Sequence, residues 1–165
     1  MEKLLEQANI RYTHLGGDPE TDKTCIIETM FATFYRPVEW YFTLLPQICQ
    51  YCNCNADSSD LQGLVEHFNI NKIGEAIIYV RKHETAYSDL DILKHVFYSS
   101  TFAEINYIYD TYFNDPNRVV DWIKLCNRNY NGLDFLLWKD IISFTDLSEA
   151  QKEGLKRVSK GIKVR

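Results

Sequence analysis

The sequence contains no apolar run of the roughly 18–20 residues that a membrane-spanning helix requires. Only four prolines and seven glycines occur in 165 residues, too few for a linker-rich or disordered chain. The N-terminal segment MEKLLEQANIRY is charged and lacks the apolar stretch and small-residue cleavage site of a signal peptide. We therefore expect a globular cytoplasmic protein with no membrane partner.

Recognisable catalytic motifs are also missing. The sequence has no HExxH, no G-x-S-x-G and no phosphate-binding glycine loop. Its four histidines, His14, His67, His83 and His95, are scattered along the chain. We expect no enzymatic activity and no cofactor, although an active site assembled only in three dimensions would leave no such motif.

Cysteine is present in an odd number, five, and without an export signal these residues are expected to be reduced thiols. Cys49, Cys52 and Cys54 form a cluster in which a Cys-x-x-Cys pair could chelate a metal ion. A structural zinc needs a fourth ligand, for which His67 and Cys25 are candidates. The favoured interpretation is that Cys49 and Cys52 are small buried hydrophobes, so no metal site is predicted.

Helix start signals organise the middle of the chain. Thr101 with Glu104 and, more weakly, Ser88 with Asp91 have the three-residue spacing of a capping box. Asp115 before a proline is a third start signal, with an apolar stripe running on to Cys126. Two further capping boxes are predicted, at Ser59–Gln62 and Ser148–Gln151.

Apolar residues elsewhere recur mostly at helical spacing. A helix is predicted from Asp22, and another follows Pro37, which Pro46 should kink or break. Residues 73–80 suit a helix, with a strand as the alternative because Ala76–Val80 is rich in β-branched residues. Residues 127–132 are predicted to form a turn, and residues 135–142 a central buried helix.

These patterns together predict an all-α fold. We expect a compact bundle or irregular array of about eight short helices, with a short N-terminal strand where residues 10–15 alternate. The start signals are unevenly spaced, so no clean repeat is predicted.

Charge is unevenly distributed along the chain. The last fourteen residues hold six basic side chains and one acid, net +5, which leaves net −10 on residues 1–151. We predict a single acidic helical domain over residues 1–147 and a basic C-terminal helix or tail over 148–165. The candidate residues for binding phosphate or an acidic partner are Lys152, Lys156, Arg157, Lys160, Lys163 and Arg165.

Aromatic residues make up 14% of the chain, and many of them are expected in the core. Those within Phe34–Phe42, and the set Tyr107, Tyr109 and Tyr112, exceed what one helix face can bury. Surplus tyrosine and tryptophan beside arginine is typical of protein interfaces. The candidate partner-binding residues are Tyr35, Arg36, Trp40, Tyr107, Tyr109 and Tyr112.

The function expected from these features is the binding of another macromolecule. A non-enzymatic adaptor, inhibitor or regulatory subunit is favoured. The abundance of residues with A/T-rich codons makes a phage or viral modulator of a host factor one form of this hypothesis. The alternatives are a nucleic-acid-associated protein that uses the basic tail and a zinc-stabilised module built on Cys49, Cys52 and Cys54.

Overall fold

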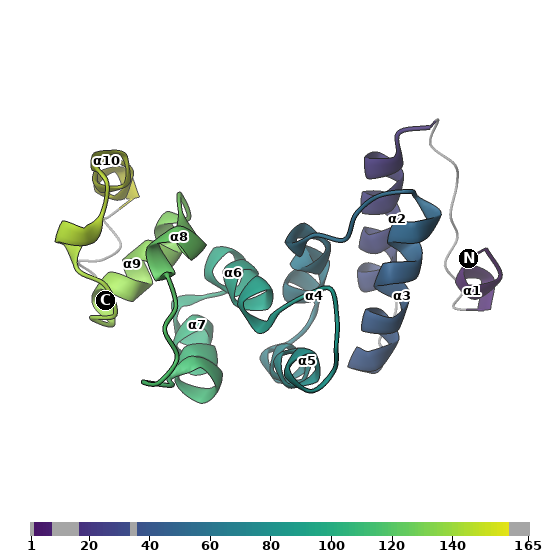
Figure 1. Cartoon of the computed structure of the whole chain (residues 1–165), viewed down its shortest axis with the longest axis horizontal. Coiled ribbons are helices and arrows are strands. Elements are labelled where there is room, and N and C mark those ends of the chain that lie inside the picture. The colour runs from purple at the N-terminus through teal and green to yellow at the C-terminus, as the bar shows by residue number, and fades with distance from the viewer. Residues whose placement is uncertain (1, 8–16, 34–35, 159–165) are drawn as a thin grey trace. The chain divides into compact units, whose positions relative to one another are not determined.

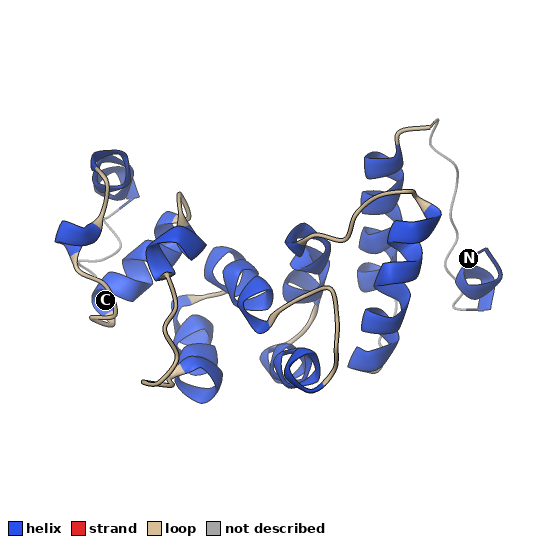
Figure 2. Cartoon of the chain, viewed as in Figure 1, coloured by secondary structure: helices blue, strands red, loops and turns tan. Residues whose placement is uncertain are grey.

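The computed structural model describes residues 2–7, 17–33 and 36–158, and every regular element in these ranges is helical (Figures 1 and 2). The predicted all-α array of short helices is therefore confirmed. The strand expected over residues 10–15 lies outside the described residues. The α-helices are α1 (Glu2–Gln7), α2 (Pro19–Thr33), α3 (Val38–Tyr51), α4 (Gln62–His67), α5 (Ile70–Lys82), α6 (Asp89–Ser99), α7 (Phe102–Ile108), α8 (Trp122–Cys126), α9 (Tyr130–Trp138) and α10 (Glu149–Val158).

Three shorter elements complete the described chain. They are the 3-10 helices η1 (Ser58–Leu61) and η3 (Phe144–Asp146) and the π-helical turn η2 (Tyr109–Phe113). None of the described helices is long and apolar enough to cross a membrane.

The chain divides into two compact units, residues 1–92 and residues 93–165. We call them the N-terminal unit and the C-terminal unit and describe each by itself. The expected division into a single domain of residues 1–147 and a basic segment of residues 148–165 stays a prediction.

Aromatic side chains hold the N-terminal unit together. Tyr41 of α3 is completely buried, stacks on Phe31 of α2 at a centroid distance of 5.0 Å and meets the edge of Phe68 at 4.7 Å. Gly63 lets α4 approach α2 closely, because a Cβ there would lie 2.5 Å from Cδ2 of Phe31. A larger side chain at residue 63 would therefore force the Phe31 side chain or the helices themselves to shift.

Of the two expected effects of Pro46, a kink or a break, the break does not occur, since α3 runs through Pro46 to Tyr51. Pro46 is exposed, while Leu45 and Ile48 on the same helix are completely buried. A proline inside a helix costs roughly 3 kcal/mol, and each fully buried Leu or Ile contributes about 1.5–3 kcal/mol. Burial of the apolar side chains of α3 therefore outweighs the cost of the proline.

The capping box expected at Ser59–Gln62 was also wrong. The Asp57 side chain accepts from the Ser59 amide at 2.8 Å, and the Asp60 side chain accepts from the Asp57 amide at 3.0 Å. The box is thus formed two residues earlier, by two aspartates, and opens η1. The strand alternative for residues 76–80 is excluded, because these residues lie inside α5, which is capped by Asn69.

Two predicted caps in the C-terminal half of the chain are confirmed. The Thr101 amide donates to Glu104 at 2.9 Å and the Glu104 amide donates to the Thr101 hydroxyl at 3.3 Å, which starts α7. The Ser88 amide likewise donates to Asp91 at 2.8 Å at the start of α6.

The core of the C-terminal unit is built around Phe135 of α9. This side chain is completely buried and contacts the rings of Phe97, Phe102 and Tyr109 at centroid distances of 5.7–5.9 Å. One phenylalanine of α9 therefore links α6, α7 and η2.

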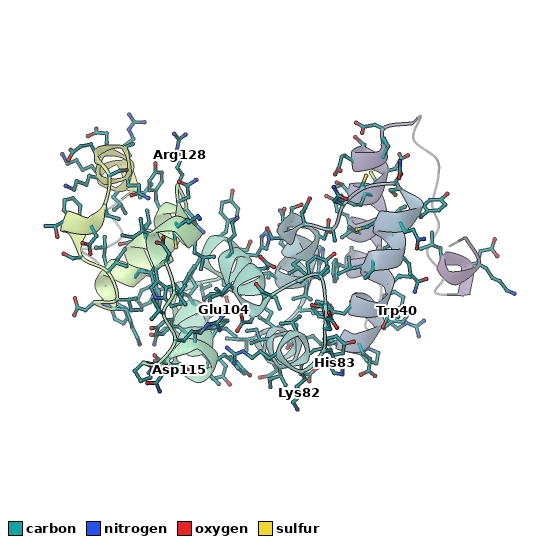
Figure 3. The ribbon with its side chains drawn as sticks, in the orientation of Figure 1. Trp40, Lys82, His83, Glu104, Asp115 and Arg128 are labelled. Atoms are coloured by element: carbon teal, nitrogen blue, oxygen red, sulfur yellow. The ribbon has the colours of Figure 1, made fainter. Side chains whose placement is uncertain are left out.

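The helix expected to start at Asp115 does not form there. The Asp115 carboxylate accepts from the Asn117 amide at 2.9 Å, which folds the segment into a local turn, and Val119 is 98% exposed. Asp121 provides the cap instead, accepting from the Lys124 amide at 3.2 Å, so α8 starts at Trp122. Asp115 lies in the loop before α8 (Figure 3).

The boundaries of α9 also differ from the prediction. Asn129 accepts from the Gly132 amide at 3.2 Å and starts the helix at Tyr130, inside the expected turn. The helix ends at Trp138 rather than at residue 142, and Asp140 has a positive φ of 60°. The apolar run of residues 135–142 is therefore only half helical.

The Ser148–Gln151 capping box that starts α10 is confirmed, with distances of 3.0 and 3.1 Å. Gln151 also donates through its side-chain amide to the Asn127 carbonyl at 2.9 Å, and Leu155 is buried. The described part of the basic segment is thus packed against the rest of the C-terminal unit.

Candidate functional site

The cysteine cluster does not assemble a metal site in the part of the chain that the structure describes, where no group of three potential ligands could hold an ion. Cys49 and Cys52 are buried, and the candidate ligand His67 places Nδ1 2.9 Å from the Gly63 carbonyl. Burial, with the neighbouring Asp60 carboxylate, raises the pKa of Cys49 to about 11. A thiol that stays protonated is a poor ligand and a poor nucleophile.

A buried ion pair that the sequence analysis missed lies beside Cys49. Lys23 of α2 is 2% exposed and Asp60 of η1 is 3% exposed, and Lys23 Nζ lies 3.1 Å from Asp60 Oδ1. Lys23 also donates to the Asn55 carbonyl at 3.0 Å. Although burial opposes the charged form, the Asp60 carboxylate outweighs it and raises the pKa of Lys23.

The second carboxylate oxygen of Asp60 is equally occupied. Oδ2 accepts from the Tyr87 hydroxyl at 2.9 Å and from the Asp57 amide at 3.0 Å, and Cys49 Sγ lies 3.6 Å away. Burial and the same carboxylate raise the pKa of Tyr87. The network joins α2, α3, η1 and the segment before α6, and the carboxylate at its centre uses both oxygens within it.

A signal for this pair was present in the sequence. Lys23 precedes Ile26 and Ile27 by three and four residues, which places it on the buried face of α2. Asp60 similarly precedes the buried Leu64 by four. A charge on an apolar face predicts a buried partner, but not which one.

The predicted partner-binding aromatics fall into two sets. Arg36 and Trp40 belong to the N-terminal unit, where the guanidinium lies 5.7 Å from the Trp40 ring centroid and Trp40 is labelled in Figure 3. Tyr107 is 47% exposed, whereas Tyr109 is only 8% exposed and packs in the core of the C-terminal unit. Tyr112 is half-buried. Tyr35 lies outside the described residues.

An exposed aromatic surface that the sequence analysis did not single out lies where the end of α9 meets α7. Trp138 is 40% exposed and its ring meets the edge of Phe102 at 4.5 Å. The neighbouring Lys139 donates to Asn106 Oδ1 at 2.7 Å and lies 2.8 Å from Asp110 Oδ1. We call Asn106, Tyr107, Asp110, Trp138 and Lys139 the α7–α9 surface.

Contacts on the α7–α9 surface hold its exposed groups in place. The Lys139 ammonium lies 5.7 Å from the Trp138 ring centroid and 5.9 Å from that of Tyr109, distances at which a cation is attracted to a ring face. Tyr107 directly follows Asn106, which Lys139 binds. An exposed tryptophan whose orientation is fixed in advance loses little entropy when it binds a partner.

The predicted basic residues are described only in α10. Lys152 lies 3.3 Å from Glu149 and 5.5 Å from the Phe144 ring centroid, while Lys156 and Arg157 are exposed. Lys160, Lys163 and Arg165 lie outside the described residues.

Arg128 adds a further exposed cation near α10. It follows Asn127, the residue that Gln151 of α10 contacts, and is labelled in Figure 3.

Charge differs sharply between the two units. Residues 1–92 carry 7 basic and 14 acidic side chains, net −7, whereas residues 93–165 carry 11 basic and 9 acidic side chains, net +2. The acidity of the chain is therefore concentrated in the N-terminal unit.

No protein-family model matches the chain, and no curated protein or solved structure is significantly similar to it.

Proposed function

We propose that the protein acts by binding another protein, through the α7–α9 surface of its C-terminal unit, and has no catalytic role. The observation that carries this proposal is the exposed, immobilised Trp138. Tryptophan and tyrosine are the residues that most often dominate binding energy at interfaces. Six of the eight exposed large hydrophobic side chains among the described residues belong to this unit.

The environment of Trp138 supports the same proposal. The ring packs edge-to-face with Phe102, and the Lys139 ammonium lies over it. Asn106 and Asp110 bind Lys139, so polar groups lie next to the aromatic group. An apolar centre with a polar rim is the usual arrangement of a protein interface. An adaptor, an inhibitor or a regulatory subunit would all use such a surface.

The experiment is an affinity pull-down from a lysate of the source organism or its host, with and without nuclease. Tyr107→Ala is compared with Tyr51→Ala, because the two tyrosines are similarly exposed, at 47% and 40%. A nuclease-resistant protein partner should be recovered with wild type and with Tyr51→Ala. The affinity of this partner for the Trp138→Ala variant should be at least ~30-fold lower than for wild type, the loss typical of a binding hot spot. Its affinity for the Tyr107→Ala variant should also be measurably lower.

Two results would overturn this proposal. One is recovery that collapses with nuclease, which would favour a nucleic-acid partner. The other is equal recovery with Trp138→Ala and wild type, which would remove the α7–α9 surface from the interaction.

Nucleic-acid binding through α10 is the second candidate, and the charge distribution favours it. The acidic side chains that would repel phosphate lie mainly in residues 1–92, whereas residues 93–165 have a net charge of +2. Lys156 and Arg157 are exposed on the last described turn of α10. Phosphate binding by such cations depends steeply on salt concentration.

A further inference from the structure

A small pocket lies in the N-terminal unit between α2 and the η1–α4 segment. Its volume is about 150 Å³. Three buried residues, Ile27, Asp60 and Gly63, form its base, and exposed residues that include Glu28, Gln62 and Glu66 form its rim. The α7–α9 surface contributes nothing to this pocket, so an inference about it goes beyond the proposed function.

Close helix packing and a buried ion pair form the walls and base of this pocket. On one side, Gly63 and Phe31 bring α4 and α2 into close contact, because a Cβ at residue 63 would lie 2.5 Å from the Phe31 ring. At the base, Asp60 is fixed by Lys23 at 3.1 Å and by the Tyr87 hydroxyl at 2.9 Å. The pocket therefore does not depend on a mobile loop.

Size restricts what the pocket can hold. Sites for cofactors and drug-sized ligands usually have volumes of about 300–1,000 Å³, well above the volume found here. A cavity of about 150 Å³ is known to accept a benzene molecule. The pocket thus fits one flat side-chain group and is too small for a nucleotide or a larger cofactor.

The carboxylates around the pocket indicate which kind of side-chain group it binds. Glu28 projects from α2 and Glu66 from α4, so a carboxylate stands on each side of the pocket. Gln62 donates to Glu66 Oε1 at 2.6 Å and orients that carboxylate. The charge of Asp60 is already matched by Lys23, so the two rim glutamates remain to interact with a ligand.

We propose that this pocket binds the guanidinium group of an arginine side chain of a partner protein. A guanidinium is planar and weakly hydrated, so its faces tolerate contact with Ile27 while its edge donates to carboxylates. The compact ammonium of lysine is more strongly hydrated and does not match a flat site as well. The net charge of −7 on residues 1–92 attracts a basic partner before contact.

The test is a two-dimensional NMR titration of the full-length protein with N-acetyl-arginine amide. N-acetyl-citrulline amide is the uncharged analogue of the same shape, and N-acetyl-lysine amide tests the preference for guanidinium. The expected result is saturable shifts confined to the amides of residues 24–28 and 59–66. Citrulline should produce no shifts, and lysine should bind more weakly than arginine.

Two charge-matched variants decide whether the pocket is responsible. Glu28→Gln combined with Glu66→Gln should weaken arginine binding at least about tenfold, because it removes both charged acceptors. Glu75→Gln combined with Glu84→Gln removes the same charge from exposed positions of the same unit and should leave binding unchanged. Unchanged peak dispersion in both variants establishes that they fold.

Three results would overturn this proposal: shifts that do not saturate, equal weakening by the two double variants, or lysine binding as tightly as arginine. The first two would indicate diffuse attraction to an acidic surface. None of the three bears on Trp138, so failure here and failure of the proposed function are distinguishable.

Discussion

Asp60 is 3% exposed and forms an ion pair with Lys23, which is just as deeply buried. Removing one member of a buried ion pair leaves an uncompensated charge, which typically costs about 3–5 kcal/mol. Asp57 and Glu20 also approach Lys23, each at 3.5 Å. Their partial compensation places the expected cost toward the lower end of that range.

We therefore predict that Asp60→Asn lowers the free energy of unfolding by about 3 kcal/mol. Asp57→Asn is the control, because this side chain is 53% exposed and asparagine still caps η1, so its cost should stay below about 1 kcal/mol. Urea unfolding monitored by circular dichroism measures both. An equal decrease in the free energy of unfolding for the two variants would show that the buried Lys23–Asp60 pair contributes no more to stability than the exposed Asp57.

The buried thiols predict a loss of stability at alkaline pH. Burial raises the pKa of Cys126 from the ordinary value of 9.0 to about 12, and burial with Asp60 raises that of Cys49 to about 11. Between pH 9 and 11 the unfolded chain releases these protons while the folded chain keeps them. The unfolded state then binds fewer protons, so stability falls as pH rises.

From pH 8 to pH 10 each of these thiols should lower the free energy of unfolding by about 1.4 kcal/mol. Cys126→Ala should remove its contribution, so the free energy of unfolding should fall by that much less between pH 8 and pH 10. Between pH 6 and pH 8 the change in the free energy of unfolding should be the same as in wild type. Urea unfolding at the three pH values provides the measurement. An unaltered slope between pH 8 and 10 would contradict the assignment to Cys126.

At the scale of elements, the structure depends on side-chain caps at helix starts. The reciprocal bonds of Thr101 and Glu104 satisfy two amides that α7 would otherwise leave without partners. Thr101→Ala should therefore reduce the free energy of unfolding by about 1 kcal/mol. The measurement is thermal or urea unfolding.

Thr111→Ala is the matched control for the cap. This exposed threonine lies in η2, and surface substitutions of this kind usually change stability by less than about 0.5 kcal/mol. A cost for Thr101→Ala no larger than for Thr111→Ala would show that the cap is energetically unimportant.

The whole molecule is electrically asymmetric, with net −7 on residues 1–92 and net +2 on residues 93–165. Nucleic-acid binding through α10 predicts salt-dependent affinity for a fluorescein-labelled oligodeoxythymidine. Removing two phosphate contacts by Lys156→Gln with Arg157→Gln should reduce the slope of log K against log salt by about 1.4. Fluorescence anisotropy at several salt concentrations measures this slope.

Lys94→Gln with Lys124→Gln is the control, because it removes two exposed charges from the same unit outside α10. An equal reduction by both double variants would indicate attraction to the whole unit rather than binding by α10. Absence of binding at low salt would remove nucleic acid from consideration.

Local chemistry is the part of the structure that the sequence alone determined. Capping boxes were predicted correctly at Ser88, Thr101 and Ser148, because a cap and its acceptor lie three residues apart and bond within one turn. The helical spacing of apolar residues likewise predicted the all-α class, because this pattern also lies within single helices. At Asp115 and at Ser59 two local bonding patterns competed, and spacing could not choose between them.

Tertiary structure alone decided which distant groups meet. The Lys23–Asp60 pair, the burial of Cys49 beside Asp60 and the continuation of α3 through Pro46 all depend on packing between helices far apart in sequence. The exposure of Trp138 and its contact with Phe102 depend on where α9 ends against α7. Such contacts are stabilised by burial, which acts between whole surfaces, so spacing along the chain does not reveal them.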